Sequence, residues 1–174
     1  ETGFIGGILF CFFTSSFALH ATENDDLVKA MMEVYAEELA ANPQDYRTYY
    51  SRAMAYFGQG DMKKALSDID NAIKYFPRKE KVDLAQAYLL RAKILSERGE
   101  TKSALTDLNS ALRLVPNHRL ALKDRGDLLC RLGQYDMAKI DYNHLLRMDT
   151  RSQSAFMGLA RVEAHTGQPV RAKD

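Results

Sequence analysis

The sequence has few residues of the kinds that build redox or covalently stapled sites. Its 174 residues include two cysteines and no tryptophan. Cys11 lies in a segment that processing would remove, so we expect no disulfide, and packing alone must hold the fold together. We expect Cys130 to be a small buried apolar residue, which is how free cysteines usually behave.

An excess of charge of one sign is also missing. The chain has 24 lysines and arginines against 23 acidic residues, which leaves a net charge of +1. Nucleic-acid binding needs a basic stripe or a high isoelectric point, so this balance predicts no nucleic-acid partner. No block of like charge and no low-complexity tract occurs, so no disordered tail is indicated.

Motifs for catalysis or metal binding are absent from the sequence. No HExxH or CxxC motif occurs, and no histidine has a histidine or cysteine three or four residues later. No stretch alternates with period two, so we expect no strands and no phosphate loop that follows one. We therefore predict a protein that is not an enzyme and has no cofactor or metal. The histidines are His20, His118, His144 and His165.

Long hydrophobic runs are limited to one, residues 4–13. Ten residues cannot span a membrane as a helix, but they suit the apolar core of a signal peptide. Small residues allow cleavage after Ala18 or Ala21, although no basic start precedes the run. Residues 1–21 are thus a trimmed start or cloning remnant (1–3) followed by a signal-like segment. Export to the periplasm or the exterior follows if they are a signal peptide, and a cytoplasmic location if they are not. The alternative is an apolar helix over 4–21 that caps the next unit.

The sequence does contain a regular repeat. Its glycines and its alanines recur with the same three spacings, 39, 34 and 34, which predicts helix pairs of one kind. The pairs are expected at 45–58 with 61–76, at 82–98 with 101–115, and at 118–132 with 135–148, after a helix over 27–41. Five extra residues within 78–84 should add a turn to the next helix, or else lengthen the loop. The repeated residues are Gly60, Gly99, Gly133 and Gly167, with Ala65, Ala104, Ala138 and Ala172.

This pattern resembles the tetratricopeptide repeat. In that repeat a bulky residue, a small one four later, Gly, Ala and Pro recur with a period of about 34 residues. The resemblance implies an all-α, right-handed superhelical solenoid of antiparallel helix pairs whose first helices line the concave face. The units are 46–79, 85–118 and 119–152, with an insertion at 80–84, an N-terminal capping or half-repeat helix at 22–45 and a truncated repeat at 153–174.

The repeated positions are expected to serve packing. The small residues should lie where the two helices of a unit meet, and they are Ala53, Ala92, Gly126 and Ala160. An arginine precedes the small residue in three units, and an aspartate follows each arginine at one fixed spacing. We expect three Arg–Asp pairs that join the helices of a unit, the alternative being a row of arginines that binds anions. The pairs are Arg52 with Asp68, Arg91 with Asp107, and Arg125 with Asp141.

The resemblance also implies where a ligand would bind. The family's groove positions make the first half of the groove aromatic and apolar and the second half charged. The alternative is that several of the apolar members pack against the helix over 27–41 and are not free. The predicted peptide-binding residues are Arg47, Tyr50, Met54, Phe57, Gln86, Leu89, Lys93, Lys123, Asp127, Arg131 and Arg161.

One known subgroup of the family is excluded by its own motif. Members that clamp the C-terminal carboxylate of chaperones use lysine, asparagine and arginine at five groove positions. Those positions hold Tyr50, Met54, Leu90, Leu120 and Asp124 here, and Asp124 would repel a carboxylate.

The sequence therefore predicts a non-catalytic scaffold that binds a peptide or helix of a partner protein, without membrane insertion once the signal segment is removed. The alternative is a structural or oligomerisation module that packs through its ends within a larger assembly, with self-association through the open C-terminal end.

Overall fold

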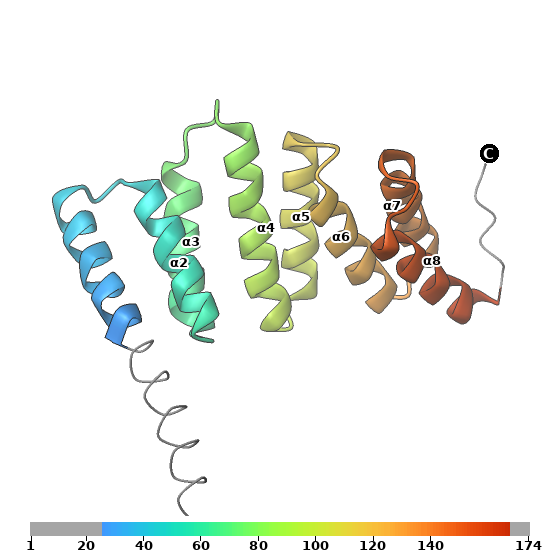
Figure 1. Cartoon of the computed structure of the whole chain (residues 1–174), viewed down its shortest axis with the longest axis horizontal. Coiled ribbons are helices and arrows are strands. Elements are labelled where there is room, and N and C mark those ends of the chain that lie inside the picture. Colours follow the sequence, from blue (N-terminus) through green and yellow to red (C-terminus); the bar gives the residue numbers. More distant parts are fainter. Residues whose placement is uncertain (1–25, 168–174) are drawn as a thin grey trace, which may run out of the picture.

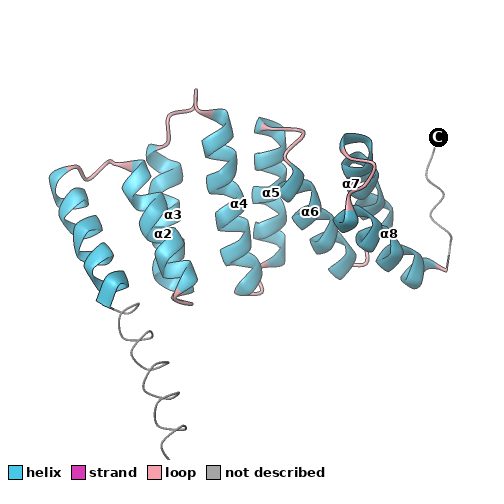
Figure 2. Ribbon diagram, viewed as in Figure 1, coloured by secondary structure: helices cyan, strands magenta, loops and turns pink. Residues whose placement is uncertain are grey.

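The computed structural model describes residues 26–167 as a row of helices (Figure 1). A helix over residues 26–41 comes first, and no strand occurs in the described part of the chain (Figure 2). The predicted signal-like segment, Pro169 and Ala172 lie outside the described residues. The remaining helices are α2 (Tyr46–Gly58), α3 (Met62–Tyr75), α4 (Lys81–Glu97), α5 (Thr101–Leu114), α6 (Arg119–Arg131), α7 (Tyr135–Met148) and α8 (Gln153–Thr166).

Successive helices pack as antiparallel pairs, α2 with α3, α4 with α5 and α6 with α7, and each pair packs on the next. The predicted all-α solenoid of helix pairs is thus confirmed. The bounds of α2 to α7 agree with the predicted ranges to within one residue at each end.

Glycine makes the sharp reversal between the two helices of a pair possible. Gly60 and Gly99 have φ of +78°, a left-handed conformation that a Cβ would penalise. The amide of the next residue, Glu100 in the second pair, then donates to the carbonyl of Leu95 at 2.8 Å. Gly133 and Gly167 have the same conformation, so the predicted helix-ending glycines are confirmed.

The five extra residues of the second unit lengthen a helix. Helix α4 begins at Lys81 and has 17 residues, whereas α2 and α6 have 13 each. Glu80, directly before α4, accepts a hydrogen bond of 2.7 Å from the hydroxyl of Tyr46. The extra turn is therefore tied back to the start of the first unit.

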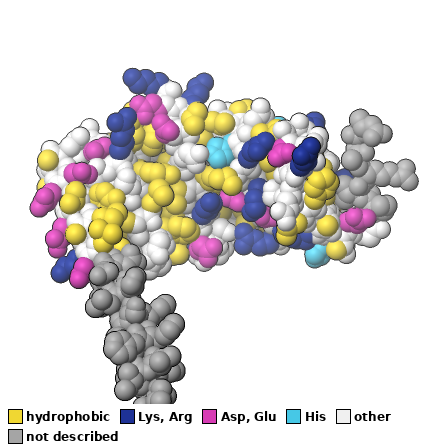
Figure 3. Space-filling view, in the orientation of Figure 1, with side chains coloured by type: hydrophobic (Ala, Val, Ile, Leu, Met, Phe, Trp, Pro, Cys, Tyr) yellow, Lys and Arg dark blue, Asp and Glu magenta, His cyan; other side chains and the backbone are white. Residues whose placement is uncertain are grey.

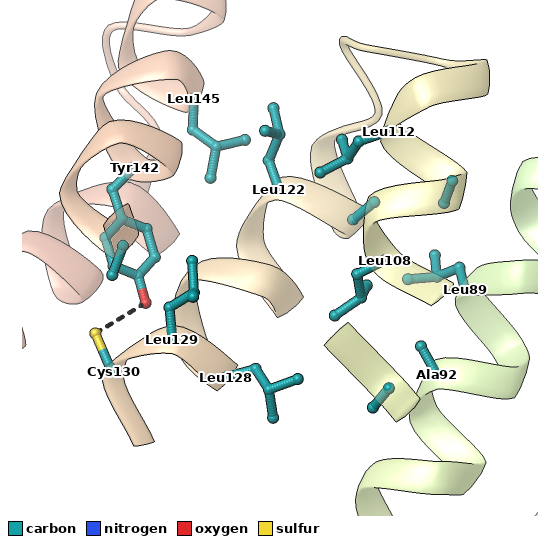
Figure 4. Close-up of a cluster of buried hydrophobic side chains, with 14 of the residues drawn as sticks. Leu89, Ala92, Leu108, Leu112, Leu122, Leu128, Leu129, Cys130, Tyr142 and Leu145 are labelled. Carbon is teal, nitrogen blue, oxygen red and sulfur yellow. Dashed lines mark hydrogen bonds between the residues drawn. The ribbon is translucent and has the colours of Figure 1, made fainter. Parts of the chain in front are cut away.

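Small residues let the paired helices approach closely. Ala53 and Ala65 are completely buried, as is Ala104, and Ala92 is 2% exposed. The buried side chains around them form two adjoining clusters, of which the larger spans α4 to α8, and Figure 4 shows part of it. The prediction fails at Ala160, which is exposed, because no second helix of its unit lies against α8 within residues 26–167.

The three Arg–Asp pairs are present and join the two helices of each unit. In each pair the guanidinium donates two hydrogen bonds of 2.6 to 2.9 Å to a buried carboxylate. Arg91 also donates to Asp70, and Arg125 to Asn109, on the preceding second helix. The arginines are thereby engaged within and between units, which makes the alternative of a free anion-binding row wrong.

Candidate functional site

The helices α2, α4 and α6 share one face of the molecule, which we call the groove face, and α8 continues it. Two cavities lie on it. The first, between α2 and α4, has a volume of about 300 Å³. Its lining combines aromatic rings with one acid and one base: Tyr46, Arg47, Tyr50, Ser51, Phe76, Asp83 and Gln86.

Aromatic contacts shape this first cavity. The rings of Tyr46 and Phe76 lie 4.3 Å apart between centroids, and the guanidinium of Arg47 lies 5.3 Å from the centre of the Tyr46 ring. Burial raises the pKa of Tyr50, and the negative charge of Asp83 raises it further. Tyr50 therefore stays neutral at physiological pH and offers a phenol edge with a hydroxyl to whatever enters.

The second cavity, between α4 and α6, has a volume of about 270 Å³. Phe57 of α2 closes one side, and five charged side chains share the rest of the lining with small and apolar ones. Arg131 donates to the hydroxyl of Ser96 at 2.7 Å, whereas Lys93 lies 4.0 Å from Asp124. The lining residues are Phe57, Ala92, Lys93, Ser96, Glu97, Leu108, Asp124, Asp127, Leu128 and Arg131.

Asp127 is the most heavily bonded residue of this cavity. It accepts hydrogen bonds from Lys123 at 2.9 Å, from Arg161 at 2.8 Å and from the buried hydroxyl of Tyr142 at 2.8 Å. Burial alone would raise the pKa of Asp127, but these hydrogen bonds outweigh it and hold the pKa below its usual value. The hydrogen bond to Asp127 raises the pKa of Lys123 in turn. Asp127 therefore fixes two cations across α6 and α8.

The structure divides the predicted groove residues into groups. Arg47, Tyr50 and Gln86 line the first cavity. Phe57, Lys93, Asp127 and Arg131 line the second one. Met54 is 51% exposed, and Lys123 and Arg161 lie beside the second cavity through their bonds to Asp127.

One predicted groove residue is misplaced. Leu89 is only 3% exposed, because it points into the core beside Leu108 (Figure 4). Two apolar or aromatic members of the predicted set are accessible, since Met54 is exposed and Tyr50 is half-buried on the cavity wall.

Sequence reasoning missed three residues of the first cavity, Tyr46, Phe76 and Asp83. Phe76 directly precedes the helix-ending Pro77, and Asp83 lies in the extra turn of α4. Both positions fall outside the family's groove positions, so the only available signal was their proximity to the insertion.

The positions that clamp a carboxylate in the chaperone-binding subgroup have other roles here. Leu90 is buried at 8% exposure, Leu120 is 49% exposed, and Asp124 faces Lys93 and Lys123. Among residues 26–167 no three acidic, histidine or cysteine side chains gather as a metal site would require. None of the helices in this part of the chain is both long and apolar enough for a membrane crossing.

A family model described as tetratricopeptide repeat matches residues 32–80, 50–119 and 89–143. A search of curated protein sequences gives no match to this chain.

Solved structures similar to the chain include a crystal structure of MamA, at 16% identity and a TM-score of 0.73, covering 84% of this chain and 83% of that one. A repeat protein from Parabacteroides merdae is 28% identical with a TM-score of 0.72, and the match covers 87% of this chain and 58% of that one. The first tetratricopeptide repeat domain of Spaghetti (RPAP3), bound to an HSP90 peptide, is 20% identical with a TM-score of 0.65. That match covers 72% of this chain and 95% of that one.

Proposed function

Because the chain belongs to the tetratricopeptide repeat family, we propose that it is a protein-interaction scaffold that binds a segment of a partner protein on its groove face. The observation that carries the proposal is the pair of cavities on this face, one aromatic and one charged. Apolar surface buried in the first would supply most of the affinity, and the charges of the second would set the orientation of the ligand.

The spacing of the cavities limits the ligand. Gln86 lines the first and Lys93 the second, seven residues apart on α4, which is about 10 Å along the helix axis. A bound helix presents side chains about 10 Å apart at positions i and i+7, and an extended peptide spans this distance in about three residues. The ligand needs an aromatic or aliphatic side chain for the first cavity and a polar or charged one for the second.

The partner differs from a chaperone C-terminus. The Spaghetti domain was solved with an HSP90 peptide, which supports peptide capture as a use of this fold. Asp124 and the exposed Leu120 stand where that mode of binding places its cations, so we propose a ligand whose recognition does not depend on a terminal carboxylate.

The test selects peptides for the purified chain from a random displayed library and measures their affinity by fluorescence polarisation. The double variant Tyr50→Ala, Met54→Ala should weaken binding at least tenfold. The matched control changes Met137 and Ile140 to alanine, which are 56% and 64% exposed on α7, outside both cavities, and should leave affinity unchanged. Selected peptides that bind the groove variant as tightly as the wild type would refute the proposal.

We also propose that the scaffold works outside the cytoplasm, in the periplasm or beyond the cell, after cleavage that follows Ala18 or Ala21. The support is the apolar run 4–13 followed by small residues at the expected distance. Mass spectrometry of the mature protein from its natural host should find a start at residue 19 or 22. A start that retains the apolar run contradicts export by cleavage.

A further inference from the structure

The wall of the first cavity contains an acid that no cation of the described chain neutralises. Asp83 is exposed on this wall, and among residues 26–167 no lysine, arginine or histidine lies within 4.0 Å of its carboxylate. Arg47 also lines the cavity, but its guanidinium lies over the ring of Tyr46, whose hydroxyl donates to Glu80 at 2.7 Å. Glu80 therefore balances the charge of Arg47, and Asp83 is left for a cation from outside.

The extra turn of α4 places this acid beside the cavity. Helices α2 and α4 begin at the same end of the molecule (Figure 1), and α4 begins at Lys81. The positions equivalent to Asp83 in the neighbouring units are Gln44 and Asn117, which precede α2 and α6 and carry no charge. The acid therefore comes from the insertion of this chain and is not a property of the repeat.

One tyrosine of the cavity also lacks a cation over its ring. Helix α2 carries four tyrosines, and three of them have an arginine or lysine of the chain 5.2 to 5.8 Å from the ring centre: Tyr46, Tyr49 and Tyr56. Tyr50 is the fourth, and within residues 26–167 no cation lies over it. The charge beside Tyr50 is instead the negative charge of Asp83. An open ring face next to a carboxylate attracts a cation on two grounds.

We propose that the first cavity binds a lysine or arginine side chain of the partner protein. The aliphatic stem of this side chain lies against the rings of Tyr46 and Tyr50, and its cation pairs with Asp83. Ser51 and Gln86 of the same lining offer oxygen acceptors for the remaining donors. The inference rests on the proposed function, because it narrows the aliphatic side chain bound in this cavity to one that ends in a positive charge.

Other side chains fit this cavity less well. An uncharged one would take water from the carboxylate of Asp83 and leave it without a partner, and an acidic one would be repelled. In Figure 3, acidic side chains lie among basic and hydrophobic ones over the start of α4, at the top of the view. The nearby cations Arg78, Lys79 and Lys81 are exposed and do not belong to the lining, so they leave the preference of the cavity unchanged.

The test sequences the peptides that the displayed library yields for the full chain. Lysine or arginine should be enriched at one fixed position among the peptides whose binding is weakened by Tyr50→Ala, Met54→Ala. One such peptide is then made with norleucine at that position, which keeps the aliphatic stem and removes the charge. In fluorescence polarisation, wild type should bind the charged peptide about fivefold more tightly than the norleucine peptide. Asp83→Asn should bind the two peptides almost equally.

The matched control is Glu97→Gln, which removes an exposed acid of α4 from the lining of the second cavity. It should keep the fivefold preference, because it changes the net charge as Asp83→Asn does. Circular dichroism checks that both variants retain their helices. Groove-binding peptides without an enriched basic residue, or a preference that survives Asp83→Asn, overturn this inference alone and leave the proposed scaffold standing. A library that yields no groove-binding peptide overturns both.

Discussion

The ring of Tyr142 lies directly against the backbone of Gly126, so that a Cβ added to the glycine would come within 2.8 Å of the Tyr142 Cε1 and Cζ atoms. Tyr142 is completely buried and occupies the position that Leu108 has in the preceding unit. Gly126 correspondingly occupies the position of Ala92. The larger ring on α7 is therefore accommodated by a smaller residue on α6. On the other side of the ring, Gly158 of α8 leaves room because it has no side chain.

This relationship predicts a strong coupling between the two positions. Gly126→Ala should lower the free energy of unfolding by roughly 1–3 kcal/mol, because the added methyl overpacks a closed site. In a Tyr142→Leu background, which restores the Leu and Ala combination of the preceding unit, the same change should cost much less and gain from helix propensity. Urea unfolding of the four proteins measures the coupling, and additive effects would contradict it.

The Arg91–Asp107 pair provides a second prediction. The Asp107 side chain is 5% exposed and receives two hydrogen bonds of 2.7 Å from Arg91. Arg91→Met leaves that carboxylate buried without its partner and should cost about 3 kcal/mol of unfolding free energy. Adding Asp107→Leu should recover much of the loss, since no charge then remains buried.

The control for this pair is Arg98, which forms an ion pair with Glu100 at 2.8 Å on the surface, where both side chains are more than a third exposed. Arg98→Met should cost under about 1 kcal/mol. Thermal or urea unfolding compares the two arginine variants, and equal effects would show that the buried pair adds nothing beyond a surface pair.

The repeat made some of these features predictable and left others hidden. Arg91, Asp107 and Gly99 recur in every complete unit at fixed spacing, so their roles followed from the sequence. The burial of Leu89 could not be predicted in this way. Helix α4 packs against α2, α3 and α5 and therefore buries residues on most of its faces, including this one at a family groove position.

The hydrogen-bond network around Asp127 could not be predicted from the sequence either. Lys123 lies four residues away on the same helix and Arg161 one repeat period away, but Tyr142 lies 15 residues away on the next helix, and no sequence pattern links the three donors to one carboxylate. Which groove charges are free and which are bonded to one another depends on the curvature of the row. The same holds for Phe76, whose position after α3 turns it toward Tyr46 only once the two helices have packed.

The glycines that end the first helices provide a third prediction. Gly99 has φ of +78°, and no atom lies within 4 Å of the place that a Cβ would take, so Gly99→Ala is penalised by backbone conformation alone. It should cost about 1 kcal/mol. Gly58 is the matched control, because it also has open space around it but ends α2 in an ordinary conformation. Gly58→Ala should be neutral or stabilising, as measured by the midpoint of thermal unfolding. Equal effects at the two sites would contradict a role for the left-handed conformation.

The bonded state of Asp127 predicts how stability depends on acid. Its pKa lies below the ordinary value of 3.8, although burial opposes ionisation, because Lys123, Tyr142 and Arg161 all donate to the ionised carboxylate. A carboxylate whose pKa is lowered by folding stabilises the folded state above its unfolded pKa, and this contribution is lost as the pH falls through the folded pKa. The free energy of unfolding of wild type should therefore decrease as the pH falls from about 5 to below the ordinary aspartate value.

Asp127→Asn removes this titration while keeping an acceptor oxygen for Tyr142 and Arg161. The variant should be less stable than wild type near neutral pH, since its amide binds Lys123 and Arg161 more weakly than a carboxylate does. The difference between the two proteins should shrink in acid, where the wild-type carboxyl is also neutral. Urea unfolding at a series of pH values measures this convergence, with Asp136→Asn as the control that removes an exposed carboxylate of α7. A difference that stays constant with pH would mean that Asp127 contributes through shape and hydrogen bonding, and that its charge does not hold Lys123 and Arg161 on the groove face.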